Sequence, residues 1–327
     1  MQPKVLPNQR NSTIDMFRLL ACFGVVAIHV HSSTAAAENT GRFLSLFCVS
    51  FFFITALTYF VANLNESADV NGIALKIWKR IGRPLLAWSV IYAGLLLAKN
   101  ILTHGNRTFD LVKIFLYADS AEHLYYLPQL IVMQVIALSV FLLINNTKHL
   151  LAVGLFAGAL GYLAWGSWHD CYGITDYRAI AVYVATAFGF ARVLKSPGRD
   201  WRYLVLGLVL AGLAVSGLLV VYPEPARSFV LVLPIGGLGL LLIALSLPSL
   251  VVPKWLATLA ATTYGVYLSH VLFLEALEFL LEKKHYTLQY NLPAKLLVTT
   301  LIFAISVVFT LVARRIPLLR ALLLGEK

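Results

Sequence analysis

Two ionisable residues of the first apolar segment are spaced so that they share one helix face. Arg18 and His29 are eleven residues apart, which is about three helical turns and about 16 Å along the axis. In a bilayer core about 30 Å thick, this spacing puts a cation near one surface and a titratable base near the other. Asp15 precedes Arg18 by three residues and can pair with it. Ionisable groups inside a membrane are costly and usually functional, so we predict a functional pair.

Histidines of two later apolar segments are predicted to meet His29. His123 begins one segment at the same predicted depth, and His270 follows Tyr264 and Tyr267 at three-residue spacing on one helix face. Because contact with lipid would be unfavourable, these side chains should face each other or water. The sequence leaves an alternative open, in which His123 and His270 only join neighbouring helices by hydrogen bonds.

A basic cluster precedes the third apolar segment. Arg80 and Arg83 are three residues apart, and Lys79 comes directly before them. In a helical turn the two guanidinium groups project to one side, an arrangement that suits phosphate groups. The alternative is that the cluster is a loop that only fixes membrane topology.

The composition is that of an integral membrane protein. Of the 327 residues, 60% are hydrophobic and 13% charged, and the formal net charge is +11; the mean hydropathy is +0.81. The basic residues punctuate apolar runs instead of forming a polar domain, which indicates membrane topology and argues against nucleic-acid binding. The three cysteines, Cys22, Cys48 and Cys171, form neither a disulfide framework nor a zinc motif, so no metal is predicted.

Ten apolar segments are long enough, or nearly so, to cross a membrane. They predict an all-α, polytopic protein with about ten transmembrane helices in a single membrane-embedded domain over residues 1–327, without a separate soluble domain. The segments are 14–32, 43–64, 84–103, 124–144, 149–166, 178–194, 203–222, 228–248, 255–280 and 293–314. Most Lys and Arg residues fall on the side of the N-terminus, so both termini are predicted to be cytoplasmic.

Two features near these segments have separate interpretations. For the first segment, the alternative is a signal peptide cleaved near residues 35–37, which are three alanines. The loop around 104–123 is predicted to contain a short interfacial helix.

This combination of motifs resembles the acyltransferase-3 family of bacterial integral-membrane O-acyltransferases. The opening IDMFRLLACFGVVAIHV matches the family's R-x10-H through Arg18 and His29, and Arg80 and Arg83 match its R-x-x-R after the second span. Further segments are similar to VSFFFITALTYF at 49–60, HLYYL at 123–127 and YGVYLSH at 264–270. The likeness covers most of the chain. Thr55-Ala56 stand where many members have Ser-Gly, so helix packing is expected to differ there.

The resemblance implies an acyl-CoA-dependent O-acyltransferase of the bacterial inner membrane. Such an enzyme moves an acyl group, most commonly acetyl, from cytoplasmic acyl-CoA to a hydroxyl of a cell-surface glycan or a lipid-linked glycan precursor. The chain is most like the members that acetylate enterobacterial common antigen. Acyl-CoA is a donor substrate here, and no permanently bound cofactor is expected. Membrane lipids and the glycan are the other expected partners, and the oligomeric state stays open.

The same interpretation gives His29 the central chemical role. His29 is expected to act as general base, or as a relay that carries the acyl group, with Arg18 and Asp15 in line with it. Two functions of other classes remain as alternatives: an exporter of glycan precursors and a non-catalytic polysaccharide-assembly subunit.

Two further groups of residues complete the predicted site. The donor's phosphate groups are expected to bind the basic cluster of Arg80, Arg83 and Lys79. The oxyanion of the tetrahedral intermediate needs a hydrogen-bond donor. The sequence leaves four candidates open: His123, Tyr126, Tyr267 and His270.

Overall fold

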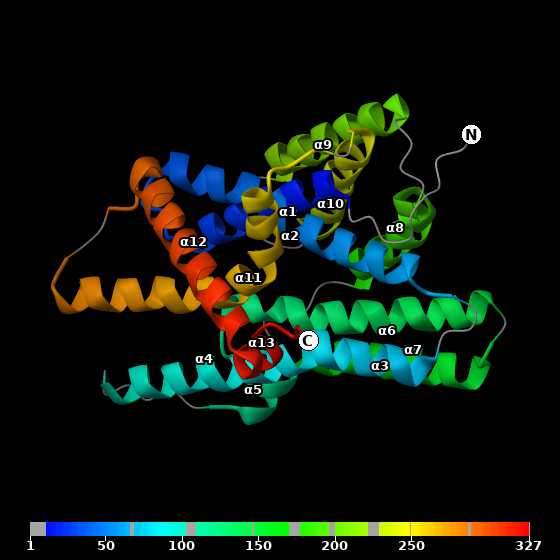
Figure 1. Ribbon diagram of the computed structural model, residues 1–327, viewed down its shortest axis with the longest axis horizontal. Coiled ribbons are helices and arrows are strands. Elements are labelled where there is room, and N and C mark those ends of the chain that lie inside the picture. The colour runs from blue at the N-terminus through cyan, green and yellow to red at the C-terminus, as the bar shows by residue number, and fades with distance from the viewer. Residues whose placement is uncertain are drawn as a thin grey trace.

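A helix overlaps each of the ten predicted segments (Figure 1). The computed structural model describes residues 11–65, 69–102, 109–145, 147–169, 177–195, 200–221, 229–248, 250–286 and 289–326, and every regular element in these ranges is helical. The ten helices are α1 (Ser12–His29), α2 (Ala35–Ala62), α4 (Arg83–Leu102), α6 (Tyr126–Ile144), α7 (His149–Trp168), α8 (Tyr177–Lys195), α9 (Trp201–Val221), α10 (Phe229–Ser246), α11 (Lys254–Lys283) and α12 (Leu292–Arg315).

Shorter helices connect or extend this set. They are α3 (Val70–Ile77), the π-helix η1 (Trp78–Gly82), α5 (Leu111–Leu116), the 3₁₀-helix η2 (Glu122–Tyr125) and α13 (Pro317–Leu323). The predicted short helix of the loop around 104–123 is present as α5, and residues 103–108 lie outside the described ranges. Its interfacial location stays a prediction.

Seven helical stretches of the described ranges are long and apolar enough to cross a membrane. They are α1, α2, α3 continued through α4, η2 with α6, α7, α11 and α12. Helices α9 and α10 contain shorter apolar stretches, Trp201–Gly217 and Val232–Ser246. The protein is therefore a multi-pass membrane protein, while the number ten and the cytoplasmic side of both termini stay predictions.

The second helix starts earlier than predicted. The sequence placed its beginning at residue 43, whereas α2 begins at Ala35, where the Thr34 hydroxyl oxygen accepts a hydrogen bond from the Ala37 backbone N–H over 3.4 Å. A threonine N-cap followed by three alanines is a strong helix start. Hydropathy alone missed it because residues 38–42 are mostly polar.

The basic cluster lies in a continuous helical stretch that joins α3 to α4. Helix α3 runs directly into the π-helix, and the Arg83 N–H donates to the Trp78 carbonyl oxygen five residues before it. Pro84 follows and has no N–H to offer the Arg80 carbonyl oxygen four residues before it. That carbonyl instead accepts a hydrogen bond from the Tyr264 hydroxyl over 3.0 Å. The proline thus accounts for the local π geometry and frees one backbone acceptor.

Helix α1 lies in the core and packs against α2, α10, α11 and α12 (Figure 1). Close packing in the neighbouring α2–α10 pair depends on glycine. A Cβ at Gly237 would stand 2.6 Å from Ser50, and one at Gly236 would stand 2.6 Å from the Leu46 carbonyl oxygen. Small residues allow such backbone approach between membrane helices.

Candidate active site

Three histidines from distant parts of the chain meet at one point. His29 ends α1, His123 lies in η2, and His270 lies in the middle of α11. The ring centroid of His29 is 5.1 Å from that of His270 and 6.0 Å from that of His123, and the latter two are 5.0 Å apart. The structure thus brings together the three histidines that the sequence predicts to meet.

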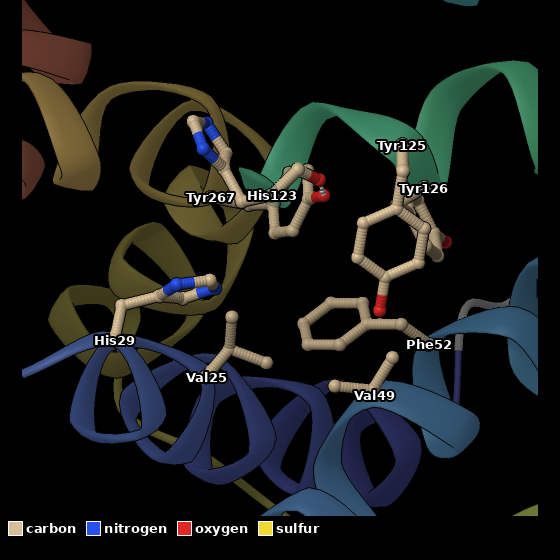
Figure 2. Close-up of a pocket in the computed structure, with 8 residues that line it drawn as sticks. All are labelled: Val25, His29, Val49, Phe52, His123, Tyr125, Tyr126 and Tyr267. Carbon is tan, nitrogen blue, oxygen red and sulfur yellow. Dashed lines mark hydrogen bonds between the residues drawn. The ribbon is translucent and has the colours of Figure 1, made fainter. Parts of the chain in front are cut away.

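A small pocket opens beside this histidine cluster (Figure 2). It holds about 280 Å³ of space that no atom occupies, part of it open to solvent. His29 points into it from α1, opposite Phe52 of α2 (Figure 2). The lining residues are Val25, His29, Val49, Phe52, His123, Tyr125, Tyr126 and Tyr267. A mostly apolar wall with a few convergent polar groups is typical of a small-molecule site.

Backbone carbonyls orient two of the three imidazoles. His270 Nδ1 lies 2.7 Å from the Tyr267 carbonyl oxygen, and His123 Nε2 lies 3.3 Å from the Leu268 carbonyl oxygen. A ring nitrogen facing a carbonyl must carry the proton, so the other nitrogen of each neutral ring is an acceptor. Those acceptors, His270 Nε2 and His123 Nδ1, are buried and have no hydrogen-bond partner among the described residues. The cluster can therefore receive hydrogen bonds from a donor that enters it.

His29 differs from the other two histidines in its accessibility. His29 and His123 both line the pocket, but His123 is 1% exposed and His270 is 0% exposed, whereas His29 is half-buried. Neither nitrogen of its ring hydrogen-bonds to another described residue. Of the three imidazoles, His29 is the one best placed to meet a substrate hydroxyl.

The four candidate oxyanion donors differ in what they already bind. The Tyr267 hydroxyl donates to the His123 carbonyl oxygen, and the donor nitrogens of His123 and His270 face carbonyls as described above. The Tyr126 hydroxyl has no such partner among the described residues, and its ring packs 4.4 Å from Phe53 and 5.1 Å from Tyr267. Tyr126 therefore keeps its O–H available at the pocket wall.

Arg18 contacts Phe52 of the pocket wall. Its guanidinium carbon lies 5.9 Å from the centroid of the Phe52 ring, a cation–π contact. Phe52 in turn lines the pocket. Asp15 lies in the first turn of α1, one turn before Arg18, and its pairing with Arg18 stays a prediction.

A tyrosine–histidine stripe of α11 joins the basic cluster to the pocket. Tyr264 binds the Arg80 carbonyl, Tyr267 binds the His123 carbonyl, and the His270 ring packs on His29. Tyr264 and His270 are six residues apart, about 9 Å along the helix axis. Lys79 and Arg80 are exposed and Arg83 is half-buried. The structure thus places the basic cluster two turns of α11 away from the histidines.

Lys295 is a site residue that the sequence analysis missed. Its ammonium-bearing side chain is 2% exposed in the first turns of α12. Its ammonium donates to the Val30 carbonyl oxygen over 2.9 Å and to the Ser32 hydroxyl over 2.8 Å. These contacts fix the chain just after His29, and a cation is favourable at the C-terminal end of α1. A lysine four residues past the N-cap of an apolar helix is the signal in the sequence.

Past the end of α1, a second small cluster surrounds Glu278. Its carboxylate lies 3.5 Å from His31 Nε2 and accepts a hydrogen bond from the Tyr290 hydroxyl over 3.2 Å. Burial, followed by the charge of Glu278, raises the pKa of Tyr290 to about 12, so the phenol remains a donor at neutral pH. The His31 side chain is 71% exposed, which makes it a useful comparison for His29.

No metal centre is found in the part of the chain that the structure describes, where no group of three His, Cys, Asp or Glu side chains is arranged to bind an ion. Cys22 and Cys48 are buried free thiols, and Cys171 lies outside the described residues.

The fold and the site define a multi-pass helical membrane protein with a histidine-lined pocket among its helices. A family model described as an acyltransferase domain, that of the acyltransferase-3 family, matches residues 11–315. The chain belongs to this family and is a membrane acyltransferase. Comparison with curated proteins and with solved structures finds no match.

Proposed function

We propose that this protein transfers an acetyl group from acetyl-CoA to a hydroxyl of a surface glycan or a lipid-linked glycan precursor in the bacterial inner membrane. The observation that carries the proposal is the accessible imidazole of His29 in the pocket of a chain that belongs to an acyltransferase family. A histidine is suited to this role because its pKa in water is near neutral.

The proposed reaction uses His29 as general base. His29 takes the proton of the acceptor hydroxyl while the hydroxyl oxygen attacks the thioester carbonyl carbon. The carbonyl oxygen becomes an oxyanion, for which Tyr126 is the donor with an uncommitted O–H. As the intermediate collapses, the C–S bond breaks, and the CoA thiolate takes the proton back from His29. An acyl-histidine relay remains the alternative, in which His29 itself attacks the thioester.

The donor is proposed to approach from the side of the basic cluster. Arg80, Arg83 and Lys79 hold its phosphate groups by charge-assisted hydrogen bonds. The acyl-bearing arm then follows the α11 stripe from Tyr264 towards His270. This arrangement accounts for a phosphate-binding cluster and a base that lie two helical turns apart.

Inverted membrane vesicles that contain the protein test the proposal. Acetyl-CoA labelled in the acetyl group is added outside, and the label is followed into the glycan fraction by mass spectrometry. We expect protein-dependent label on a sugar hydroxyl. Label that stays on CoA while unmodified glycan precursor crosses the membrane would instead support the exporter. The absence of both effects, with the protein required for polymer assembly, would support the assembly subunit.

A further inference from the structure

The C-terminal segment packs onto the basic cluster at the start of α4. The Trp88 indole N–H donates to the Leu323 carbonyl oxygen over 3.0 Å, which fixes α13 on α4. Gly325, with φ of +62°, approaches the π-helix so closely that a Cβ there would stand 2.7 Å from the Arg80 carbonyl oxygen. Only glycine adopts this backbone conformation and this approach without strain. Because the family match ends at residue 315, it assigns no role to this segment.

Arg320 belongs to the same corner of the molecule. Its carbonyl oxygen accepts a hydrogen bond from the Glu326 N–H over 3.2 Å, so the chain curls back beside the residue that touches Arg80. The Glu326 carboxylate is already paired with Arg314, at 3.1 Å from Nε and 2.5 Å from Nη2. Glu326 therefore neutralises Arg314.

Arg83 and Arg320 each have one donor atom without a hydrogen-bond acceptor in the described part of the chain. Both side chains are half-buried, and the Nε atom of each is buried without a hydrogen-bond partner among the described residues. Buried polar atoms are nearly always paired in native proteins, and a charged donor without an acceptor is especially unfavourable. Helix α4, which begins at Arg83, packs directly on α13, which carries Arg320. An anion with several oxygens, such as phosphate, satisfies two guanidinium groups at once.

We propose that Arg320 and Arg83 together bind phosphate groups, and that α13 with the Gly325 turn closes this site over the π-helix. The identity of the ligand, the nucleotide end of a CoA donor, rests on the proposed function. The phosphate of an anionic lipid headgroup has the same chemistry. Arg320 lies outside the matched family region and adds a third phosphate-binding arginine to Arg80 and Arg83 of the R-x-x-R motif.

Binding to the purified full-length protein in phosphatidylcholine nanodiscs tests the site. The dissociation constant of CoA is measured by calorimetric titration for wild type, Arg320→Gln, Arg83→Gln and the double variant. Loss of one charge-assisted contact should weaken CoA binding by about tenfold in each single variant. Arg315→Gln is the matched control, because this neighbouring arginine is exposed; we expect binding within about twofold of wild type.

A second pair of variants separates phosphate binding from folding. Arg320→Lys keeps the charge without the planar fork and should bind CoA with intermediate affinity. Gly325→Ala keeps every charge but displaces the C-terminal turn from the π-helix, so it should also weaken CoA binding. CoA affinity equal to wild type in Arg320→Gln and in Gly325→Ala would overturn the assignment of this site to CoA.

Nanodiscs with phosphatidylglycerol identify the source of the phosphate. Thermal stabilisation by this lipid that is lost in Arg320→Gln, with CoA binding unchanged, would assign the site to a lipid headgroup. If wild type binds no CoA but keeps the Arg320-dependent lipid effect, the donor proposal fails and the anion site stands. If wild type binds CoA and neither CoA nor lipid depends on Arg320, the anion site fails and the donor proposal stands.

Discussion

Replacement of Lys295 by methionine should separate catalysis from stability. The substitution keeps a long side chain but removes an ammonium that donates to the Val30 carbonyl oxygen at 2.9 Å and the Ser32 hydroxyl at 2.8 Å. Each hydrogen bond from a charged group contributes about 1.5–3 kcal/mol, whereas burying the charge costs several kcal/mol. These effects nearly cancel, so the free energy of unfolding should stay within about 2 kcal/mol of wild type.

Activity should respond differently because Val30 directly follows His29. Without the ammonium, the end of α1 loses the contact that fixes it, and a shift of about 1 Å in a reacting group can lower the rate about 10²-fold. We therefore expect kcat to fall by about 30- to 100-fold with the KM for acetyl-CoA nearly unchanged. Gly41→Ala, whose Cβ would stand 3.3 Å from the ammonium, should cause a smaller loss of the same kind.

The assay for Lys295 combines two measurements on one preparation. Acetyl transfer is followed in proteoliposomes over a range of acetyl-CoA concentrations, and thermal unfolding is followed by tryptophan fluorescence. Lys284→Met is the matched control, since Lys284 is exposed just after α11. A folded Lys295→Met protein with kcat within twofold of wild type would refute the positioning argument, as would a loss of activity that only follows a loss of folded protein.

Three further substitutions test other parts of the site and fold. Arg18→Lys keeps the charge but loses the planar group that lies over Phe52, so we expect kcat to fall by at least about tenfold; wild-type kcat would make Arg18 a topological charge. Tyr126→Phe should lower kcat by about 10²-fold without changing donor affinity, measured by the same kinetics, and a larger effect of Tyr267→Phe would reverse this assignment. Gly237→Val should lower the melting temperature because its Cβ would stand 2.6 Å from Ser50, and an unchanged melting temperature would contradict the close α2–α10 packing.

The sequence predicted the helices well because a membrane span needs a long apolar run, which is a local property. It also predicted the meeting of His29, His123 and His270, since each is polar, lies at a similar predicted depth, and avoids lipid by facing the others. It did not predict the π-helix at the basic cluster, because the Arg80 carbonyl that Pro84 leaves free accepts its hydrogen bond from the Tyr264 hydroxyl of a distant helix.

Other parts of the site depend on contacts that local patterns do not contain. In the sequence, Lys295 looks like any lysine that sets membrane topology. Its contact with the end of α1 exists only once α12 packs against that end. Tyr267 and Tyr126 are equivalent oxyanion candidates until the hydroxyl of Tyr267 is found bound to the His123 carbonyl. The role of the C-terminal segment likewise follows only from its packing on α4.

The most direct test of the account compares His29→Ala with His31→Ala in the proteoliposome assay. Both variants remove one imidazole near the end of α1, but His31 is 71% exposed and does not line the pocket. If His29 is the base, His29→Ala should lower acetyl transfer by about 10²- to 10⁴-fold with normal insertion and CoA binding, while His31→Ala stays near wild type. Acetyl transfer near the wild-type rate in a correctly inserted His29→Ala protein would contradict the account.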